Sequence, residues 1–489
     1  MARRINHMEM HLILRRQHTL PLLLGATLVV TACPGTGEGE GEGEGEGEGE
    51  GEGEGEGEGE GEGEGEGEGE GEGEGEGENA PCAAGETAGL TLPTGFCATV
   101  FSESVGRPRH IAVADNGDVY VAEANAQDGT DTGGVWALRD DDGDGVADIT
   151  EFVHDGGASG IDVDGDQVFV GLSDQVLRFT LSADDIVPRE PVIVATGLPS
   201  DGDHFHKSVL VVGDDLVVNI GSATNACQVD NRVAGSPGID PCLELDVRAG
   251  LWRFDKNGEA QTQAEGGERI VTGLRNGNAF TALPDGTLIT IQNGRDQLFE
   301  NWPAQFTAEE SARLPAEAMY VLEEDGDYGW PYCFWDPVQN TNVLAPEYGG
   351  DGETVGRCAD IPAPVLSLPA HWAPLGLAFV GDDDEGFAGW PAAFKGGVFV
   401  GVHGARFDAP LSPEGVPGYD VEFIKMDGTA VVGTHTPFAS GFVGDVEAIT
   451  TLPDEAAHRP VGVAAAPDGS LYVTDDKGGH IWRIFHVGG

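Results

Sequence analysis

The chain has 489 residues, 39% of them hydrophobic, and carries a formal net charge of −61 at pH 7. Setting aside residues 1–33, whose net charge is +3, and the 21 glutamates of a repeat at 37–78 leaves −43 for residues 79–489. A surface this acidic repels nucleic acid phosphates and anionic lipid headgroups. We therefore expect no nucleic acid partner, and a folded part that handles neutral substrates or cations.

The first 33 residues have the pattern of a secretory signal. Several arginines precede an apolar run at 20–30 that is too short to span a bilayer. The run ends in Val30-Thr31-Ala32-Cys33, which resembles a lipobox, in which the cysteine carries lipid. We predict a lipoprotein signal peptide over 1–33 and an exported protein anchored to a bacterial membrane through Cys33. An ordinary signal peptide with a chance cysteine is the alternative.

Residues 37–78 repeat Gly-Glu 21 times. Glycine is the residue that loses most backbone entropy on ordering, and closely spaced glutamates repel one another. We predict that residues 34–78 form a disordered linker, which reaches roughly 140 Å when stretched. Such a linker would hold residues 79–489 away from the membrane, with the outer membrane favoured because Pro34 is not the Asp associated with inner-membrane retention.

One pattern recurs six times in residues 79–489: alternating apolar residues, a turn rich in Asp, Asn and Gly, then a second strand. The copies begin at Arg109, Gly160, Lys207, Asn276, Leu375 and Val461. Alternation around a glycine-containing turn is typical of β-hairpins. A β-sandwich would also contain many strands, but not one turn pattern six times. We therefore predict an all-β fold, a six-bladed β-propeller over 79–489.

The ends of this region predict how the ring closes. The sixth copy ends near Ile484 and has no outer strand of its own. The alternating segment 96–101 can supply that strand from the N-terminal side. Each blade's first strand would then line the central channel.

Six cysteines remain after Cys33, namely Cys82, Cys97, Cys227, Cys242, Cys333 and Cys358. An even number in an exported chain indicates disulfides. Fifteen pairings are possible, and closeness in sequence favours Cys82–Cys97, Cys227–Cys242 and Cys333–Cys358. Because none lies in a CxxC pattern, metal or thiol chemistry is the weaker interpretation.

Residues 140–151 have the pattern of a calcium-binding loop. Side-chain oxygens stand at loop positions 1, 3, 5, 9 and 12, with glycine at position 6 where such loops turn sharply. The predicted ligands are Asp140, Asp142, Asp144, Asp148 and Glu151, with the carbonyl of Val146. We expect structural calcium in an insertion of the first blade; an acidic, solvated turn is the alternative.

Five segments together resemble the quinoprotein sugar dehydrogenases, the family of soluble glucose, aldose sugar, sorbosone and pyranose dehydrogenases. They read Gly-Leu-Arg-Asn at 273–276, Gln-Asn-Gly-Arg-Asp at 292–296, Gly-Trp-Pro-Tyr at 329–332, and shorter pieces at 371–377 and 459–463. The resemblance covers most of residues 94–489. It implies a propeller that binds pyrroloquinoline quinone and Ca²⁺ at one end of its channel.

The resemblance also implies roles for single residues. His204 matches the catalytic base, and Arg275 and Asn276 match residues that contact the quinone oxygens. The backbone carbonyls of Gly294 and Arg295 match ligands of the cofactor's calcium.

Three further residues of the cofactor site follow from the same resemblance. Asn293 stands where some relatives have Gln. Arg459 is a candidate to hold a cofactor carboxylate, and Arg406 replaces a cofactor-contacting lysine of the glucose enzymes.

This set of residues suits the oxidation of an alcohol or hemiacetal. A neutral histidine removes the hydroxyl proton while hydride leaves the carbon, and Arg275 stabilises charge on the reduced cofactor. Each of these residues also has a non-catalytic interpretation. His204 would be an exposed loop residue, and Arg275 a structural partner of Asp296. His371 and His403 would be channel histidines with satisfied hydrogen bonds.

We therefore expect an enzyme that oxidises a sugar or aldose and passes electrons to an external acceptor, a cytochrome c or a quinone. A calcium-dependent lactonase-type hydrolase and a non-catalytic binding module on a tether are the alternatives. Substrate pockets in this architecture are built by blade loops, so the sequence does not name the sugar.

Overall fold

The computed structural model describes residues 82–125, 132–182, 185–405, 418–444 and 453–488. Cys33, the Gly-Glu repeat and Arg406 lie outside these ranges, so the predictions made for them remain predictions. Among the helices within these ranges, none is long and apolar enough to cross a membrane.

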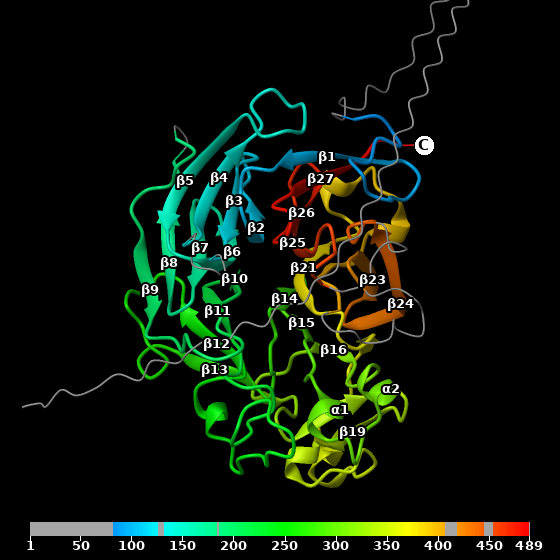
Figure 1. The fold of residues 1–489 in the computed structure, drawn as a ribbon. Helices are drawn as coiled ribbons and strands as arrows, with labels where there is room; N and C mark the ends of the chain where they lie inside the picture. The colour runs from blue at the N-terminus through cyan, green and yellow to red at the C-terminus, as the bar shows by residue number, and fades with distance from the viewer. Residues whose placement is uncertain (1–81, 126–131, 183–184, 406–417, 445–452, 489) are drawn as a thin grey trace, which may run out of the picture. The chain divides into compact units, whose positions relative to one another are not determined.

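The strands form six sheets of four or five strands, one for each predicted repeat (Figure 1). The first three blades contain β2 (Pro108–Val113), β3 (Val119–Glu123), β4 (Gly134–Arg139) and β5 (Ile149–Asp155); β6 (Ala158–Asp164), β7 (Gln167–Leu172), β8 (Gln175–Thr180) and β9 (Val192–Thr196); and β10 (Val209–Val212), β11 (Asp215–Ile220), β12 (Gly250–Asp255), β13 (Glu268–Thr272) and β17 (Gly326–Asp327).

The last three blades contain β14 (Ala279–Ala282), β15 (Leu288–Gln292), β16 (Glu317–Val321) and β20 (Leu366–Leu368); β21 (Pro374–Val380), β22 (Gly397–Val402), β23 (Val421–Asp427) and β24 (Ala430–Ala439); and β25 (Pro460–Ala465), β26 (Leu471–Asp475), β27 (Ile481–His486) and β1 (Phe96–Ser102). The fold is thus the predicted six-bladed propeller.

Tight turns join the first two strands of most blades. The turn glycines all have positive φ angles, which side chains with a Cβ rarely adopt: Gly117, Gly165, Gly213, Gly286 and Gly469. This conformation is the physical reason for the repeated Asp, Asn and Gly signal in the sequence.

The six first strands surround a channel of about 290 Å³. Because the first two strands of a blade are antiparallel, the start of the first lies beside the end of the second. Pro108 thus faces Glu123, Pro374 faces Val402 and Pro460 faces Asp475. We call this end of the channel, where every first strand begins, the entry face.

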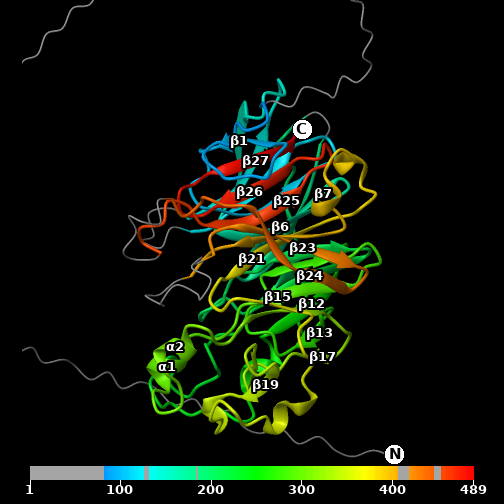
Figure 2. The same ribbon diagram turned by 90° about the vertical axis from the view of Figure 1, so that its right-hand side faces the viewer.

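The sixth blade is closed by the N-terminal strand, as the sequence predicts. β1 pairs antiparallel with β27, with Phe96 opposite His486, and Figure 2 shows β1, β27, β26 and β25 as neighbouring strands. The Phe96 ring is buried and packs edge-on against Trp390 and Phe438, with centroid distances of 4.7 and 5.2 Å. The first strand of the chain is therefore anchored in the core between the fifth and sixth blades.

The three predicted disulfides are all present: Cys82–Cys97, Cys227–Cys242 and Cys333–Cys358. Cys333 begins β18 (Cys333–Asp336), which forms a hairpin with β19 (Thr341–Leu344). Two short helices, α1 (Leu298–Asn301) and α2 (Ala308–Ser311), precede β16. The hairpin and the two helices are insertions in the fourth blade that lie outside its sheet.

Replacing Phe96 by Ala tests the closure of the ring. Because the ring is 1% exposed, we expect the free energy of unfolding to fall by about 3–5 kcal/mol, the usual cost of a buried Phe→Ala change. Urea unfolding followed by tryptophan fluorescence measures this loss. Val338→Ala, at a site 76% exposed, should change the same quantity by less than about 0.5 kcal/mol. A Phe96→Ala loss as small as that of the control would contradict the closure.

Candidate active site

The entry face gathers nearly all the described candidate residues. The residues just before or at the start of first strands are Arg109, His204, Arg275, Asn276, His371 and Arg459. The residues just after second strands are Ser222, Asn225, Asn293, Gly294, Arg295, Asp296, His403 and Asp476. Residues up to 367 positions apart thereby come into hydrogen-bond contact.

His204 has a defined tautomer. Its Nδ1 lies 3.0 Å from the carbonyl oxygen and 2.9 Å from the hydroxyl oxygen of Ser222. The carbonyl can only accept, and the hydroxyl donates its own proton to the carbonyl of Thr224. Nδ1 therefore carries the proton, which leaves Nε2 with a free lone pair.

The surroundings also keep His204 neutral. Burial, and then the nearby Arg275 guanidinium, lower the pKa of the imidazole to about 3. His204 packs closely against Gly221, where an added Cβ would lie 2.6 Å from the Cβ of His204. An unprotonated nitrogen at neutral pH is what a general base requires.

Arg275 is buried and fully engaged. Its guanidinium donates to the carbonyl of Gly294 at 2.7 Å and to Oδ1 of Asn225 at 3.0 Å. It also pairs with the Asp296 carboxylate at 2.9 Å. Arg275 thus forms the structural ion pair with Asp296 that the sequence offered as an alternative. If Arg275 also stabilises charge on a cofactor, it does so from this fixed position.

Asp296 is the shared anion of this cluster. Arg232 binds the same carboxylate oxygen at 3.0 Å, and Nδ1 of His371 lies 3.8 Å from the other oxygen. Burial opposes ionisation, but Arg275, Arg232 and His371 hold the pKa of the Asp296 carboxyl below its ordinary value. We call His204, Arg232, Arg275, Asp296 and His371 the Arg275 cluster.

Two asparagine side chains on this face have unpaired oxygens. Oδ1 of Asn276 and Oδ1 of Asn293 are buried without a hydrogen-bond partner. The amide nitrogen of Asn293 is used, because it donates to the carbonyl of Pro374 at 3.0 Å. Buried polar atoms normally find partners, so these oxygens are free to accept from a ligand.

The predicted calcium carbonyls lie in a tightly bonded turn. The carbonyl of Gly294 already accepts from Arg275, and the Gly294 amide donates to Glu317 at 2.6 Å. The Arg295 side chain forms a buried ion pair with Glu347. A cation at this turn would therefore share the Gly294 carbonyl with a guanidinium.

Asp476 organises a second group on the same face. It binds Arg109 at 2.7 Å and the Nε2 of His403 at 2.8 Å, and these groups hold the pKa of its carboxyl well below the ordinary value, against the effect of burial. Arg459 donates to the carbonyls of His403 and Gly404 at 3.0 and 3.1 Å. Arg459 thus lies on the entry face, and its role toward a cofactor stays a prediction. We call Arg109, His403, Arg459 and Asp476 the Asp476 cluster.

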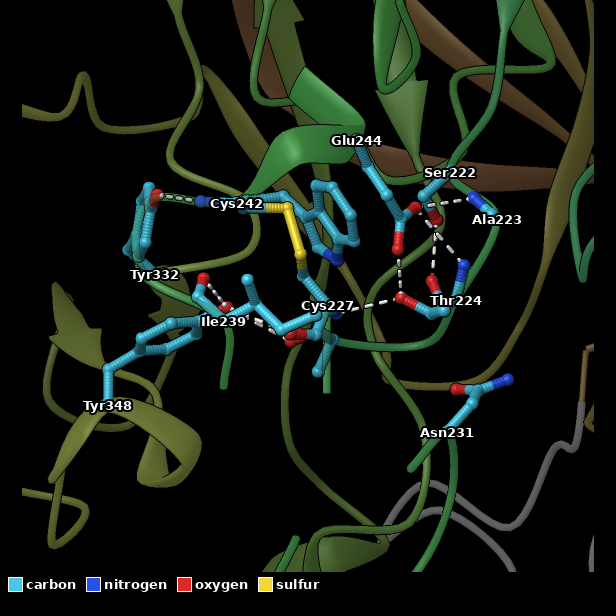
Figure 3. The surroundings of a disulfide bond; sticks show 12 residues. Ser222, Ala223, Thr224, Cys227, Asn231, Ile239, Cys242, Glu244, Tyr332 and Tyr348 are labelled. Carbon is cyan, nitrogen blue, oxygen red and sulfur yellow. Dashed lines mark hydrogen bonds between the residues drawn. A yellow bond between two sulfur atoms is a disulfide. The ribbon is translucent and has the colours of Figure 1, made fainter. Parts of the chain in front are cut away.

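A disulfide-linked loop positions the Ser222 side of the site (Figure 3). The Glu244 carboxylate accepts from the amides of Ala223 and Thr224 at 2.6 and 3.2 Å, and from the Thr224 hydroxyl at 2.5 Å. That hydroxyl in turn accepts from the Cys227 amide at 2.8 Å. The Cys227–Cys242 disulfide therefore braces the segment that orients His204 and Arg275.

Only some of the predicted ligands of the calcium-binding loop lie close together. Asp140, Asp142 and Asp148 each offer an oxygen within 4.8 Å of the others, whereas Asp144 and Glu151 lie outside that group. Asp140 is also paired with Arg483 at 2.8 Å. The Asp140 oxygens accept the amides of Gly143 and Gly145, which shapes the loop without any ion.

Several functional neighbours escaped the sequence reasoning. Asn225 holds Arg275 and also both backbone groups of Asp296, while Glu317 anchors the Gly294 turn. Neither residue stands in a recognisable pattern. Asp476 follows directly on β26, and its position at a strand end was the one available signal.

Comparison with known proteins identifies the family of the chain. The family model described as TrAA12-like matches residues 90–486, most of the chain and all six blades. The chain belongs to the TrAA12-like family. This membership confirms the resemblance to quinoprotein sugar dehydrogenases.

Solved structures share the fold of this TrAA12-like protein. The holo pyrroloquinoline quinone domain of pyranose dehydrogenase from Coprinopsis cinerea matches at TM-score 0.63 and 20% identity, over 81% of this chain and 96% of that one. A calcium structure of a Trichoderma reesei carbohydrate-active enzyme of family AA12 matches at 0.64 and 17%, over 84% and 99%. Apo aldose sugar dehydrogenase from Escherichia coli matches at 0.52 and 17%, over 80% and 99%. Identities this low show the fold alone.

An uncharacterized protein from Borreliella burgdorferi is 25% identical over 297 residues, 59% of this chain. The chain spans 63% of that relative's length.

Glu317 gives the site a pH-dependent stability. Burial raises the pKa of its carboxyl from 4.5 to about 7. The protonated Glu317 therefore contributes fully to the free energy of unfolding below pH 4.5, and this contribution is lost as pH rises to about 7. The reason is that the carboxyl of the unfolded chain releases its proton at a lower pH than that of the folded protein. Relative to wild type, Glu317→Gln should gain on the order of 1–3 kcal/mol between pH 4.5 and 7.5.

Urea unfolding at several pH values measures this difference. The exposed Glu353→Gln is the matched control and should show no such trend. If the difference between Glu317→Gln and wild type does not change with pH, the buried carboxyl is not the group responsible.

Proposed function

We propose that this TrAA12-like protein is a pyrroloquinoline quinone-dependent dehydrogenase that oxidises a sugar or related aldose. One observation carries the proposal. His204 presents an unprotonated Nε2 at the channel end, with its Nδ1–H held by Ser222 and its pKa lowered to about 3 by burial and the nearby Arg275. A base fixed next to a cation suits removal of a hydroxyl proton as charge develops nearby.

The residues present fit the chemistry of the quinone. Pyrroloquinoline quinone carries carboxylates and carbonyl oxygens, and the entry face offers the guanidiniums of Arg109 and Arg459. Arg275, whose donors are taken by the chain itself, adds positive charge there. The unpaired buried oxygens of Asn276 and Asn293 are available for its ring N–H group or for a cation. When bound, the quinone would supply the two-electron acceptor that no amino-acid side chain provides.

Side chains of the protein would each have a separate role in the reaction. The His204 Nε2 would take the substrate hydroxyl proton, and Ser222 would hold the resulting imidazolium through Nδ1. Asp296 stays ionised beside Arg275 and Arg232, and its negative charge partly offsets the effect of Arg275 on the His204 imidazole. The electrons would later pass to an external acceptor, a cytochrome c or a quinone.

Two parts of the proposal concern the surroundings of the enzyme. Three disulfides suit an oxidising compartment, which supports export. The lipobox-like segment supports a lipid anchor at Cys33. Cys33→Ser would then release the protein from the membrane fraction of expressing cells, and retention there would count against the anchor.

The decisive experiment combines cofactor binding with turnover. Full-length protein is titrated with pyrroloquinoline quinone in Ca²⁺-containing buffer, and dye reduction is followed with a panel of aldoses. We expect His204→Asn to bind the quinone but lose at least about 100-fold in turnover, the usual scale of general-base catalysis. Asn276→Ala should weaken binding, since it removes an unpaired oxygen, whereas the exposed Asn257→Ala should not.

Failure of the wild type to bind the quinone would end the dehydrogenase proposal and favour a hydrolase or a binding module. Binding with full turnover in His204→Asn would overturn only the assignment of the base.

We further propose that residues 140–148 bind structural Ca²⁺, supported by the three gathered carboxylates. Ca²⁺ should raise the melting temperature of wild type more than that of Asp142→Ala, in which an oxygen ligand is lost. Differential scanning fluorimetry with chelator and with added Ca²⁺ measures both shifts. Asp382→Ala, another acidic position outside the loop, is the control, and equal shifts in all three proteins would assign the calcium elsewhere.

A further inference from the structure

A second group of possible metal ligands lies beside the Asp476 cluster. His458, Asp475 and His480 each offer one ligand atom, and these atoms all lie within 4.8 Å of one another. His458 precedes β25, Asp475 ends β26 and His480 precedes β27. Three separate points of the sixth blade thus converge at one spot.

Both ring nitrogens of His480 lie against oxygen atoms. Its Nε2 lies 2.8 Å from the Glu103 carboxylate, and its Nδ1 lies 3.2 Å from the carbonyl of Gly478. Both oxygens can only accept. Such a ring either carries two protons or meets a cation with the nitrogen that faces the cluster.

Asp475 is a rigid anchor for this cluster. Its side chain is fully buried; one oxygen accepts from the amides of Arg459 and Lys477 at 2.7 and 2.9 Å. The other accepts from the Gly478 amide at 2.9 Å and lies 2.7 Å from Nδ1 of His458. The carboxylate therefore holds its place before any ion binds.

Gly478 packs directly against His458 and Asp475, whose facing atoms lie 2.7 Å apart. A Cβ at this position would lie 2.4 Å from Nδ1 of His458 and 2.6 Å from the Asp475 oxygen. Any other residue would intrude between the two groups.

The side chains of the neighbouring cations make bonds elsewhere. The Lys477 ammonium donates to the carbonyls of Pro453 and Asp454, and the Arg459 guanidinium donates to those of His403 and Gly404. The Lys477 bonds go to neutral carbonyls, and Asp475 and Glu103 place negative charge next to the imidazoles.

We propose that His458, Asp475 and His480 bind a divalent transition-metal cation of the zinc type. Two imidazole nitrogens with a carboxylate favour such an ion over Ca²⁺, which prefers oxygen ligands throughout. Glu103 would accept the outer N–H of His480, the usual second interaction of a metal-bound histidine. The two histidine side chains are 24% and 23% exposed, which leaves a coordination position for water.

The bound metal would cross-link two segments next to the entry face. It joins the segment before β25, which carries Arg459, to the turn between β26 and β27, which carries Asp476. Metal binding would therefore stiffen the Asp476 cluster. This inference does not depend on the proposed dehydrogenase activity.

Zn²⁺ titration of the full chain tests the site. Metal-stripped protein is titrated calorimetrically in excess Ca²⁺, which saturates sites made of oxygens alone. His480→Phe removes a ligand but keeps a ring to pack on Trp482, which His480 stacks against at a centroid distance of 5.2 Å. Glu103→Gln alters an exposed residue, and His154→Phe on β5 is the control histidine.

We expect wild type and His154→Phe to bind one Zn²⁺ per chain with equal affinity. His480→Phe should lose this binding, and Glu103→Gln should weaken it by about 10- to 100-fold. Co²⁺ should give visible absorption bands of a nitrogen- and oxygen-ligated site in wild type and not in His480→Phe. Wild type that binds no more Zn²⁺ than His480→Phe, or Glu103→Gln with unchanged affinity and Co²⁺ spectrum, would overturn the proposal.

Discussion

The pairing of β1 with β27 is the constraint on which the rest of the structure depends. Without it the sixth blade would end in an unpaired edge, and no backbone hydrogen bonds would join the first described strand to the last. The pairing is reinforced by the buried Phe96 among Trp390 and Phe438. Since the candidate residues of the entry face come from five of the six blades, its geometry holds only while the ring is closed.

Burial and charge together define the two clusters at that face. Ions taken out of water are costly unless they are paired and hydrogen-bonded. Asp296 meets this condition with two guanidiniums, and Asp476 with Arg109 and His403. The same desolvation keeps His204 neutral, so one environment explains both the fixed anions and the free base.

Loops that carry reactive groups need external bracing, because irregular backbone has few hydrogen bonds of its own. In this protein the bracing takes several forms. Glu244 and the Cys227–Cys242 disulfide hold the Ser222 segment, and Glu317 holds the Gly294 turn. The proposed metal at His458, Asp475 and His480 would do the same for the Arg459 side. Rigidity supplied from outside the reacting groups is the common feature.

Local chemistry explains what the sequence determined by itself. Strand alternation and glycine turns with positive φ are properties of neighbouring residues, so the six hairpins, the outer strand at 96–101 and the three short-range disulfides were all predictable. Arg275 and His204 were found because they lie within recognisable segments.

Only the tertiary structure could decide the rest, because it depends on contacts between distant parts of the chain. Asn225 reaches the site from a loop of the third blade and Glu317 from the start of β16, and Asp140 meets Arg483 across 343 positions. The unpaired oxygens of Asn276 and Asn293, like the convergence of His458 with His480, become visible only when every neighbour is in place. Hydrogen-bond satisfaction is a property of the folded environment and not of the residue type.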